Sequence, residues 1–129
     1  MILVDTSVWI ELLGGKGHRP STEDLVHFVT CGPIIQEVTQ GLRPGRAGES
    51  FRDGFLAMPK LSDPLPAELF LEAAEIYRDA RRRGITIRSS TDCLIAAIGI
   101  ANSVAVWHRD RDFTAIARFT RLRVMERES

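Results

Sequence analysis

The chain alternates short apolar runs with stretches in which apolar residues recur at helical spacing. The first run, residues 1–4 (MILV), predicts a buried strand, and the capping side chains of residues 5–7 precede an apolar helical stretch. A similar pair follows at residues 28–31, where an apolar and β-branched run comes before Pro33, a residue suited to the first turn of a helix. This order of elements predicts strand–helix units.

The second half of the chain predicts a long amphipathic helix and a buried one. Residues 66–84 (PAELFLEAAEIYRDARRRG) have apolar side chains at helical spacing, acids early, arginines late and Gly84 as the stop signal. Residues 89–101 (SSTDCLIAAIGIA) begin with capping side chains and are then apolar on every side, which is typical of a helix inside a domain. Short strands are predicted at residues 103–107 (SVAVW) and 122–125 (LRVM).

The connecting segments complete the architecture. Residues 14–21 (GGKGHRPS) predict a flexible loop and not a phosphate-binding loop, because Ser or Thr does not follow the lysine. Residues 49–58 are predicted helical, and residues 59–64 (PKLSDP) a short strand or a connector. Strands that alternate with helices predict an α/β domain, with a mainly parallel sheet of about five strands between two helical layers. Ligands of such sheets bind at the carboxyl ends of the strands.

Composition sets the limits of this domain. With 129 residues, 44% of them hydrophobic and 26% charged, the chain fits a single domain over residues 1–129. It has neither a run long enough to cross a bilayer nor a signal-peptide pattern, so we expect a cytoplasmic protein without membrane association. Residues 1–75 hold 6 Lys/Arg and 11 Asp/Glu, whereas residues 76–129 hold 11 Arg and 6 Asp/Glu. This asymmetry permits a polyanion on one face, and a chance distribution of surface charge explains it equally well.

Four acidic residues occupy corresponding places, each at the carboxyl end of a predicted strand or near the start of a helix: Asp5, Glu37, Asp92 and Asp110. Each has an ordinary explanation when taken alone, as a helix cap, a helix-surface carboxylate or a turn residue. These explanations predict no convergence of the four side chains. A parallel sheet, in contrast, brings all four positions to one edge.

Carboxylates that converge in one cleft repel one another. The repulsion raises their pKa values and costs stability unless a divalent cation neutralises the charge. Cys31 and Cys93 have no metal-type spacing, and no His pair is placed to join the acids. An all-oxygen donor set predicts Mg²⁺ or Mn²⁺ in preference to zinc.

Four segments together carry a resemblance to a known family. Residues 1–13 (MILVDTSVWIELL), 33–38 (PIIQEV), 91–101 (TDCLIAAIGIA) and 106–113 (VWHRDRDF) resemble the PIN-domain ribonucleases, and most closely the VapC-type toxins of bacterial toxin–antitoxin pairs. The segments come in family order and span nearly the whole chain. The resemblance implies a PIN-like α/β/α sandwich and an endoribonuclease that hydrolyses RNA phosphodiester bonds with Mg²⁺ or Mn²⁺. It also implies a homodimer, held inactive by a cognate VapB-type antitoxin in a hetero-oligomer.

The resemblance also assigns roles to individual acids. Asp5, Glu37, Asp92 and Asp110 match the acidic quartet that binds metal and carries catalysis in the family. Asp112 matches an additional acid that some members have. A metal on these carboxylates would lower the pKa of a bound water for in-line attack on a phosphodiester.

Neighbouring side chains have weaker assignments. Thr6 and Ser7 lie beside the first acid, where a hydroxyl in similar proteins orders the site, and a capping role is compatible with this. His108 stands where relatives carry Thr or Ser, and packing at the strand end is favoured over contact with an RNA phosphate. Arg109 and Arg111 are candidate RNA contacts through charge-assisted hydrogen bonds, and they could equally offset the acidic cluster.

Two other classes of protein are alternatives. A phosphorelay receiver domain has a parallel sheet and an acidic Mg²⁺ pocket, but it needs paired acids after the first strand and a lysine after the last, and the chain's lysines are Lys16 and Lys60. A catalytically silent PIN-like module would only bind RNA or protein. The intact acidic quartet argues against it.

Overall fold

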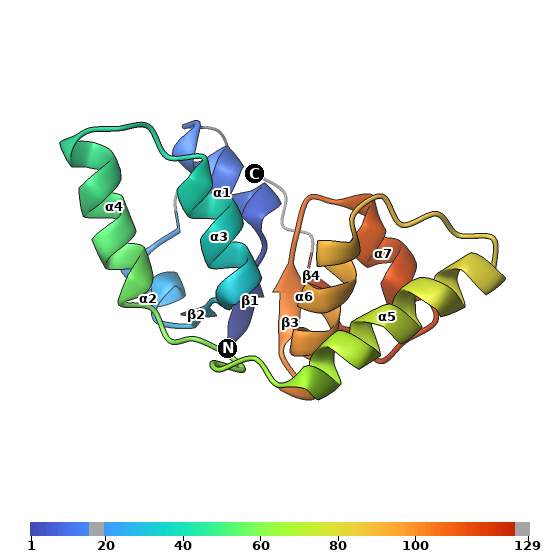
Figure 1. The fold of residues 1–129 in the computed structure, drawn as a ribbon. Helices are drawn as coiled ribbons and strands as arrows, with labels where there is room; N and C mark the ends of the chain where they lie inside the picture. The colour runs from blue at the N-terminus through green and yellow to red at the C-terminus, as the bar shows by residue number, and fades with distance from the viewer. Residues whose placement is uncertain (16–19, 126–129) are drawn as a thin grey trace.

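The structure is a computed structural model that describes residues 1–15 and 20–125. Its helices and strands alternate along the chain (Figure 1). In chain order they are β1 (Ile2–Val4), α1 (Thr6–Leu13), α2 (Thr22–Leu25), β2 (Phe28–Val29), α3 (Gly32–Gln40), α4 (Arg46–Leu56), α5 (Ala67–Arg82), α6 (Ser90–Ala101), β3 (Ala105–Trp107), α7 (Arg111–Ala117) and β4 (Val124–Met125). The predicted loop at residues 14–21 falls partly outside the described residues.

The sheet is parallel throughout its described ladders and has the strand order β2-β1-β3-β4. The predicted α/β sandwich is confirmed, with four strands in the described chain where about five were expected. The segment 59–64 is a connector that adds one bridge, between Thr30 and Lys60. Prolines at both of its ends lack the N–H that a longer ladder would need.

Local chemistry explains where the helices begin and end. The Asp5 carboxylate caps α1 by accepting from the Ser7 N–H, and Pro33 lies in the first turn of α3. Helix α5 stops before Gly84, whose φ of 74° suits a residue without Cβ. Helix α7 lies between the strands predicted at residues 103–107 and 122–125, in a segment for which the sequence predicted no helix.

The core lies between the sheet and the helices on its two sides. Figure 1 shows α1, α3 and α4 grouped beside β1 and β2, and α5, α6 and α7 grouped beside β3 and β4. The central α6 is buried on nearly every side, as predicted, and Ile95 and Ile98 are fully buried. Gly99 lets α6 approach the sheet, because a Cβ there would lie 3.1 Å from Val106 Cγ2. The last turn of α6 is therefore packed directly against β3.

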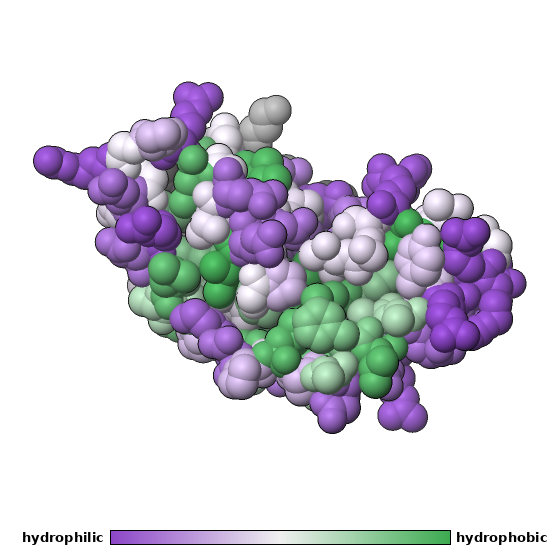
Figure 2. Space-filling model, in the orientation of Figure 1, coloured by the Kyte–Doolittle hydropathy of each residue, from purple (hydrophilic) through white to green (hydrophobic). Residues whose placement is uncertain are grey.

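One surface region is markedly apolar. Figure 2 shows hydrophobic side chains gathered over the first half of α5. Phe70 and Leu71 there are 52% and 71% exposed. Beside them, Phe70, Tyr77 and Leu94 line a groove of about 460 Å³ between α5 and α6. No helix in the described ranges combines the length and the apolar character that a membrane span requires.

Candidate metal centre

The parallel pairing of β1 with β3 brings two of the predicted acids to one edge of the sheet. Val4 pairs with Trp107 at the end of the two strands, and the Asp5 N–H donates to the Trp107 carbonyl at 2.9 Å. Asp110 follows β3 and caps α7, where its Oδ1 accepts from the Asp112 N–H at 2.9 Å. Burial raises the pKa of Asp5, and the nearby charge of Asp110 adds to this effect.

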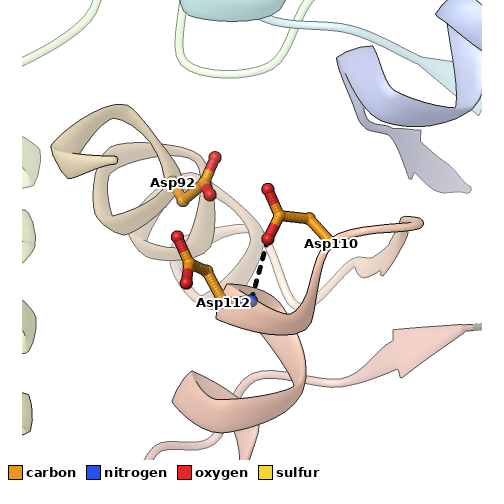
Figure 3. A group of neighbouring side chains, drawn as sticks. All are labelled: Asp92, Asp110 and Asp112. Carbon is orange, nitrogen blue, oxygen red and sulfur yellow. Dashed lines mark hydrogen bonds between the residues drawn. The ribbon is translucent and has the colours of Figure 1, made fainter. Parts of the chain in front are cut away.

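Three carboxylates form a compact group beside this edge. Asp92, in the first turn of α6, joins Asp110 and Asp112, and one oxygen from each lies within 4.8 Å of the others. Figure 3 shows the three side chains pointing toward a shared space between α6 and the start of α7. Asp92 and Asp112 are buried, and Asp110 is half-buried. The geometry suits a cation that would bridge the two helices.

Asp92 has the most unfavourable surroundings for a negative charge. Burial raises its pKa to about 9, and the negative charges of Asp110 and Asp5 act in the same direction. Its Oδ2 is buried and has no hydrogen-bond partner among the described residues. A buried carboxylate oxygen without a donor costs free energy, and a bound cation would remove that cost.

Asp5 and Glu37 extend the acidic site toward α3. The Ser7 hydroxyl donates to Asp5 Oδ2 at 2.6 Å, and the Thr6 hydroxyl donates to Glu37 Oε1 at 3.0 Å. Burial raises the pKa of both acids despite these donors, the charge of Asp110 acts in the same direction on both, and the charge of Asp5 also raises the pKa of Glu37. The two hydroxyls therefore orient the acids, as well as lying in the first turn of α1.

Arg88 was not singled out by the sequence analysis. Its guanidinium lies 3.3 Å from Asp110 Oδ1 and 3.9 Å from Asp112 Oδ1, and its side chain is 55% exposed. Asp112 Oδ2 also accepts from the backbone N–H groups of Arg88 and Ser89, at 3.1 and 3.4 Å. Asp112 thereby fixes the segment that leads into α6. No local signal in the sequence distinguishes Arg88 from the other arginines of the second half.

The three candidate RNA-binding residues occupy different environments. His108 is fully buried, its Nδ1 accepts from the Asp110 N–H at 3.1 Å, and its ring lies 5.3 Å from that of Phe113. This environment matches packing at the strand end and offers no surface for a phosphate. The Arg109 guanidinium donates to Glu11 at 3.1 Å, whereas Arg111 is exposed at the edge of the acidic site.

The donor set fits a hard divalent cation. All the converging side chains offer carboxylate oxygens, which Mg²⁺ and Mn²⁺ prefer. Cys31 and Cys93 are buried nearby, and burial raises their thiol pKa values to about 12 and about 11. Burial thus favours the neutral form of both thiols.

Comparison with known proteins decides the family. Residues 2–119 match the PIN domain. The chain belongs to the PIN-domain family. It is 37% identical to the VapC11 ribonuclease of Mycobacterium tuberculosis and to a VapC ribonuclease of Mycobacterium bovis, in each case over 95% of this chain and 96% of the relative.

The same fold occurs in solved structures of other proteins. The structure of VapBC2 from Rickettsia felis, bound to a DNA fragment from its promoter, superposes with a TM-score of 0.74 at 17% identity and covers 99% of this chain and 100% of that one. The resemblance inferred from the four sequence segments is thus confirmed. The family match to the PIN domain also argues against the alternative of a phosphorelay receiver domain.

Proposed function

We propose that this PIN-domain protein is a metal-dependent endoribonuclease that acts as the toxin of a type II toxin–antitoxin pair. The convergence of Asp92 with Asp110 and Asp112, in a chain 37% identical over nearly its full length to VapC ribonucleases, carries the proposal. A silent binding module has no need for a buried carboxylate whose pKa is raised to about 9.

Asp5, Asp92 and Asp110 would hold the cation, with Glu37 at the α3 side and Asp112 at the far side. Bound Mg²⁺ or Mn²⁺ supplies Lewis-acid polarisation of the phosphodiester and a lowered pKa for water. The half-buried position of Glu37 suits a group that accepts a proton from water or orients it.

The chain's other residues order these acids before substrate arrives. Ser7 holds Asp5 and accepts from the Arg109 N–H at 2.9 Å, so one hydroxyl links the ends of β1 and β3. Thr6 holds Glu37 from the same turn of α1. Preorganisation of this kind removes a reorganisation cost from the reaction.

Cleavage of RNA by the purified chain tests the proposal. Wild-type protein should cleave total RNA with Mg²⁺ or Mn²⁺, and EDTA should stop the reaction. Asp92→Asn and Asp5→Ala should abolish cleavage. Asp53→Asn, which neutralises an α4 carboxylate whose side chain is 73% exposed, is the matched control and should cleave normally. Cleavage in EDTA, or full activity of Asp92→Asn, would overturn the proposed function.

The exposed apolar surface of α5 supports a protein partner. A large exposed apolar patch marks an interaction site, and Phe70 and Leu71 project from this one. We include in the proposal a homodimer and a cognate VapB-type antitoxin that inhibits the nuclease, and the RNA substrate places the activity in the cytoplasm. Light scattering of the chain, alone and co-expressed with an antitoxin, measures both assemblies. A monomer that no antitoxin inhibits would contradict this part.

A further inference from the structure

An open groove runs along α7 from the acidic site. It has a volume of about 550 Å³, and Asp110 and Asp112 line one end of it. Its wall is formed by Arg111, Thr114 and Ala115 of α7, by Arg118, which caps the carboxyl end of that helix, and by Thr86 of the segment before α6. The spacing of these α7 residues, i, i+3, i+4 and i+7, places them on one face of the helix. The groove is therefore continuous with the candidate metal centre.

Arg111 and Arg118 have no partner for their charge. Both side chains are exposed, and within the described residues neither forms an ion pair or a hydrogen bond through its guanidinium. In contrast, Arg88 and Arg109, the other arginines near the site, pair with carboxylates. Residues seven apart on a helix are separated by about 10 Å along its axis. Two unpaired cations at this separation suit two separate phosphates of one strand.

We propose that the α7 groove is a track for the RNA backbone, in which Arg111 and Arg118 each bind a phosphate on one side of the scissile bond. The inference rests on the proposed function and adds the course of the substrate. Arg111 binds nearest the acids, and Arg118 holds the strand farther along α7. Ala115 lies between them on the same face, and its small side chain leaves the floor of the groove open. Backbone contacts of this kind fix the position of a strand without reading its sequence.

The salt dependence of binding tests this track. Binding of a short fluorescein-labelled single-stranded RNA is measured by anisotropy over a series of KCl concentrations, with Asp92→Asn protein in EDTA so that the RNA stays intact. Arg111→Gln and Arg118→Gln should each weaken binding about fivefold. Each should also reduce the slope of log Kd against log salt by about 0.7, the value for one phosphate contact on a single strand.

Arg121→Gln is the matched control. Arg121 is exposed and lines a small depression with Ser103 and Val104, which precede β3 and lie at the amino end of the sheet, opposite the acids. The Arg121→Gln substitution removes the same charge as the other two, and it should leave the RNA affinity and the slope of log Kd against log salt close to those of the Asp92→Asn protein. If all three variants behave alike, net charge and not a track explains the binding, and the proposal is overturned.

Two further measurements distinguish phosphate contacts from recognition of bases or ribose, and the RNA track from the nuclease activity. A single-stranded DNA of the same sequence, and RNAs of other sequences, should lose affinity by the same factor, because phosphates carry no sequence information. A loss confined to one sequence or to RNA would show base or ribose recognition and overturn the track. Cleavage by wild-type protein is scored separately. An inactive protein with the expected arginine effects would thus refute the nuclease while leaving the track intact.

Discussion

The Asp92→Asn substitution should stabilise the protein when divalent cations are removed, and the gain should grow with pH. Burial and the negative charges of Asp110 and Asp5 raise the Asp92 pKa to about 9 in the folded chain, from an ordinary value of 3.8. Between these values the folded protein keeps a proton that the unfolded chain releases, so unfolding becomes more favourable as pH rises. Asparagine is neutral at every pH and escapes this loss.

The size of the effect follows from proton linkage. Within this window each pH unit lowers the unfolding free energy of the wild type by about 1.4 kcal/mol relative to the variant. From pH 5 to pH 7 the difference changes by up to about 2.7 kcal/mol, or about 10 °C in Tm for a domain of this size. Burial raises the pKa values of Asp5 and Glu37 as well, but both acids are present in both proteins and cancel in the comparison.

Urea and thermal unfolding of both proteins in EDTA, at several pH values from 5 to 8, measure this difference. Asp53→Asn controls for the loss of an ordinary exposed carboxylate and should show no such pH-dependent gain. Addition of Mg²⁺ should narrow the gap, because a bound cation favours the ionised Asp92. A gap that is the same at pH 5 and pH 7 would refute the reasoning. A variant that is less stable at every pH would mean that Asp92 serves only as a helix-start carboxylate.

Four further substitutions test the residues that support the acidic site and the packing of two helices. Ser7→Ala removes a donor 2.6 Å from Asp5 and should lower the unfolding free energy by about 1 to 2 kcal/mol and slow RNA cleavage; wild-type values in urea unfolding and initial rates would contradict it. Arg88→Gln removes a cation that shares the carboxylates with the metal, so calorimetry should show several-fold tighter Mg²⁺ binding, and weaker binding would mean that Arg88 mainly positions the acids. Gly99→Ala should lower the free energy of unfolding by about 1 to 3 kcal/mol, because the new Cβ would meet Val106 Cγ2 at 3.1 Å. In contrast, a Cβ at Gly54 in α4 would meet nothing within 4 Å, so Gly54→Ala should raise the free energy of unfolding by about 0.5 to 1 kcal/mol. Equal unfolding midpoints for the two glycine variants would contradict that comparison.

Local patterns were sufficient to predict the elements that carry the acids. The short apolar run MILV and the longer apolar segment after the capping residue Ser89 are typical of a buried strand and a buried helix, and both elements lie where the patterns indicate. Helix α7 was missed because Asp110 and Asp112 read as turn residues. They are in fact its cap and its first turn. The segment 59–64 is a connector and not a strand, and its two terminal prolines already favour this in the sequence.

Contacts between distant segments could not be predicted in the same way. The bond from Thr6 to Glu37 spans 31 residues, and that from Arg88 to Asp110 spans 22. Only the packing of α1 on α3, and of the segment before α6 on α7, creates them. A single sequence holds no pairing signal for such contacts, since Arg88 differs in no local property from Arg83 or Arg118. The acids themselves could be predicted to meet because they follow strands whose parallel pairing is a property of the whole sheet.

The difference between Asp110 and Asp112 follows from the same distinction. The two aspartates are one residue apart and look interchangeable in the sequence. Asp110 is the N-cap of α7 and its Oδ1 accepts from the Asp112 N–H, while its half-buried side chain faces Asp92 (Figure 3). Asp112 is buried, and its Oδ2 accepts from the backbone at Arg88 and Ser89, just before the helix that carries Asp92. Asp112 therefore fixes the segment that leads into α6 and Asp92, and Asp112→Asn should disturb the position of Asp92 whether or not Asp112 contacts a cation.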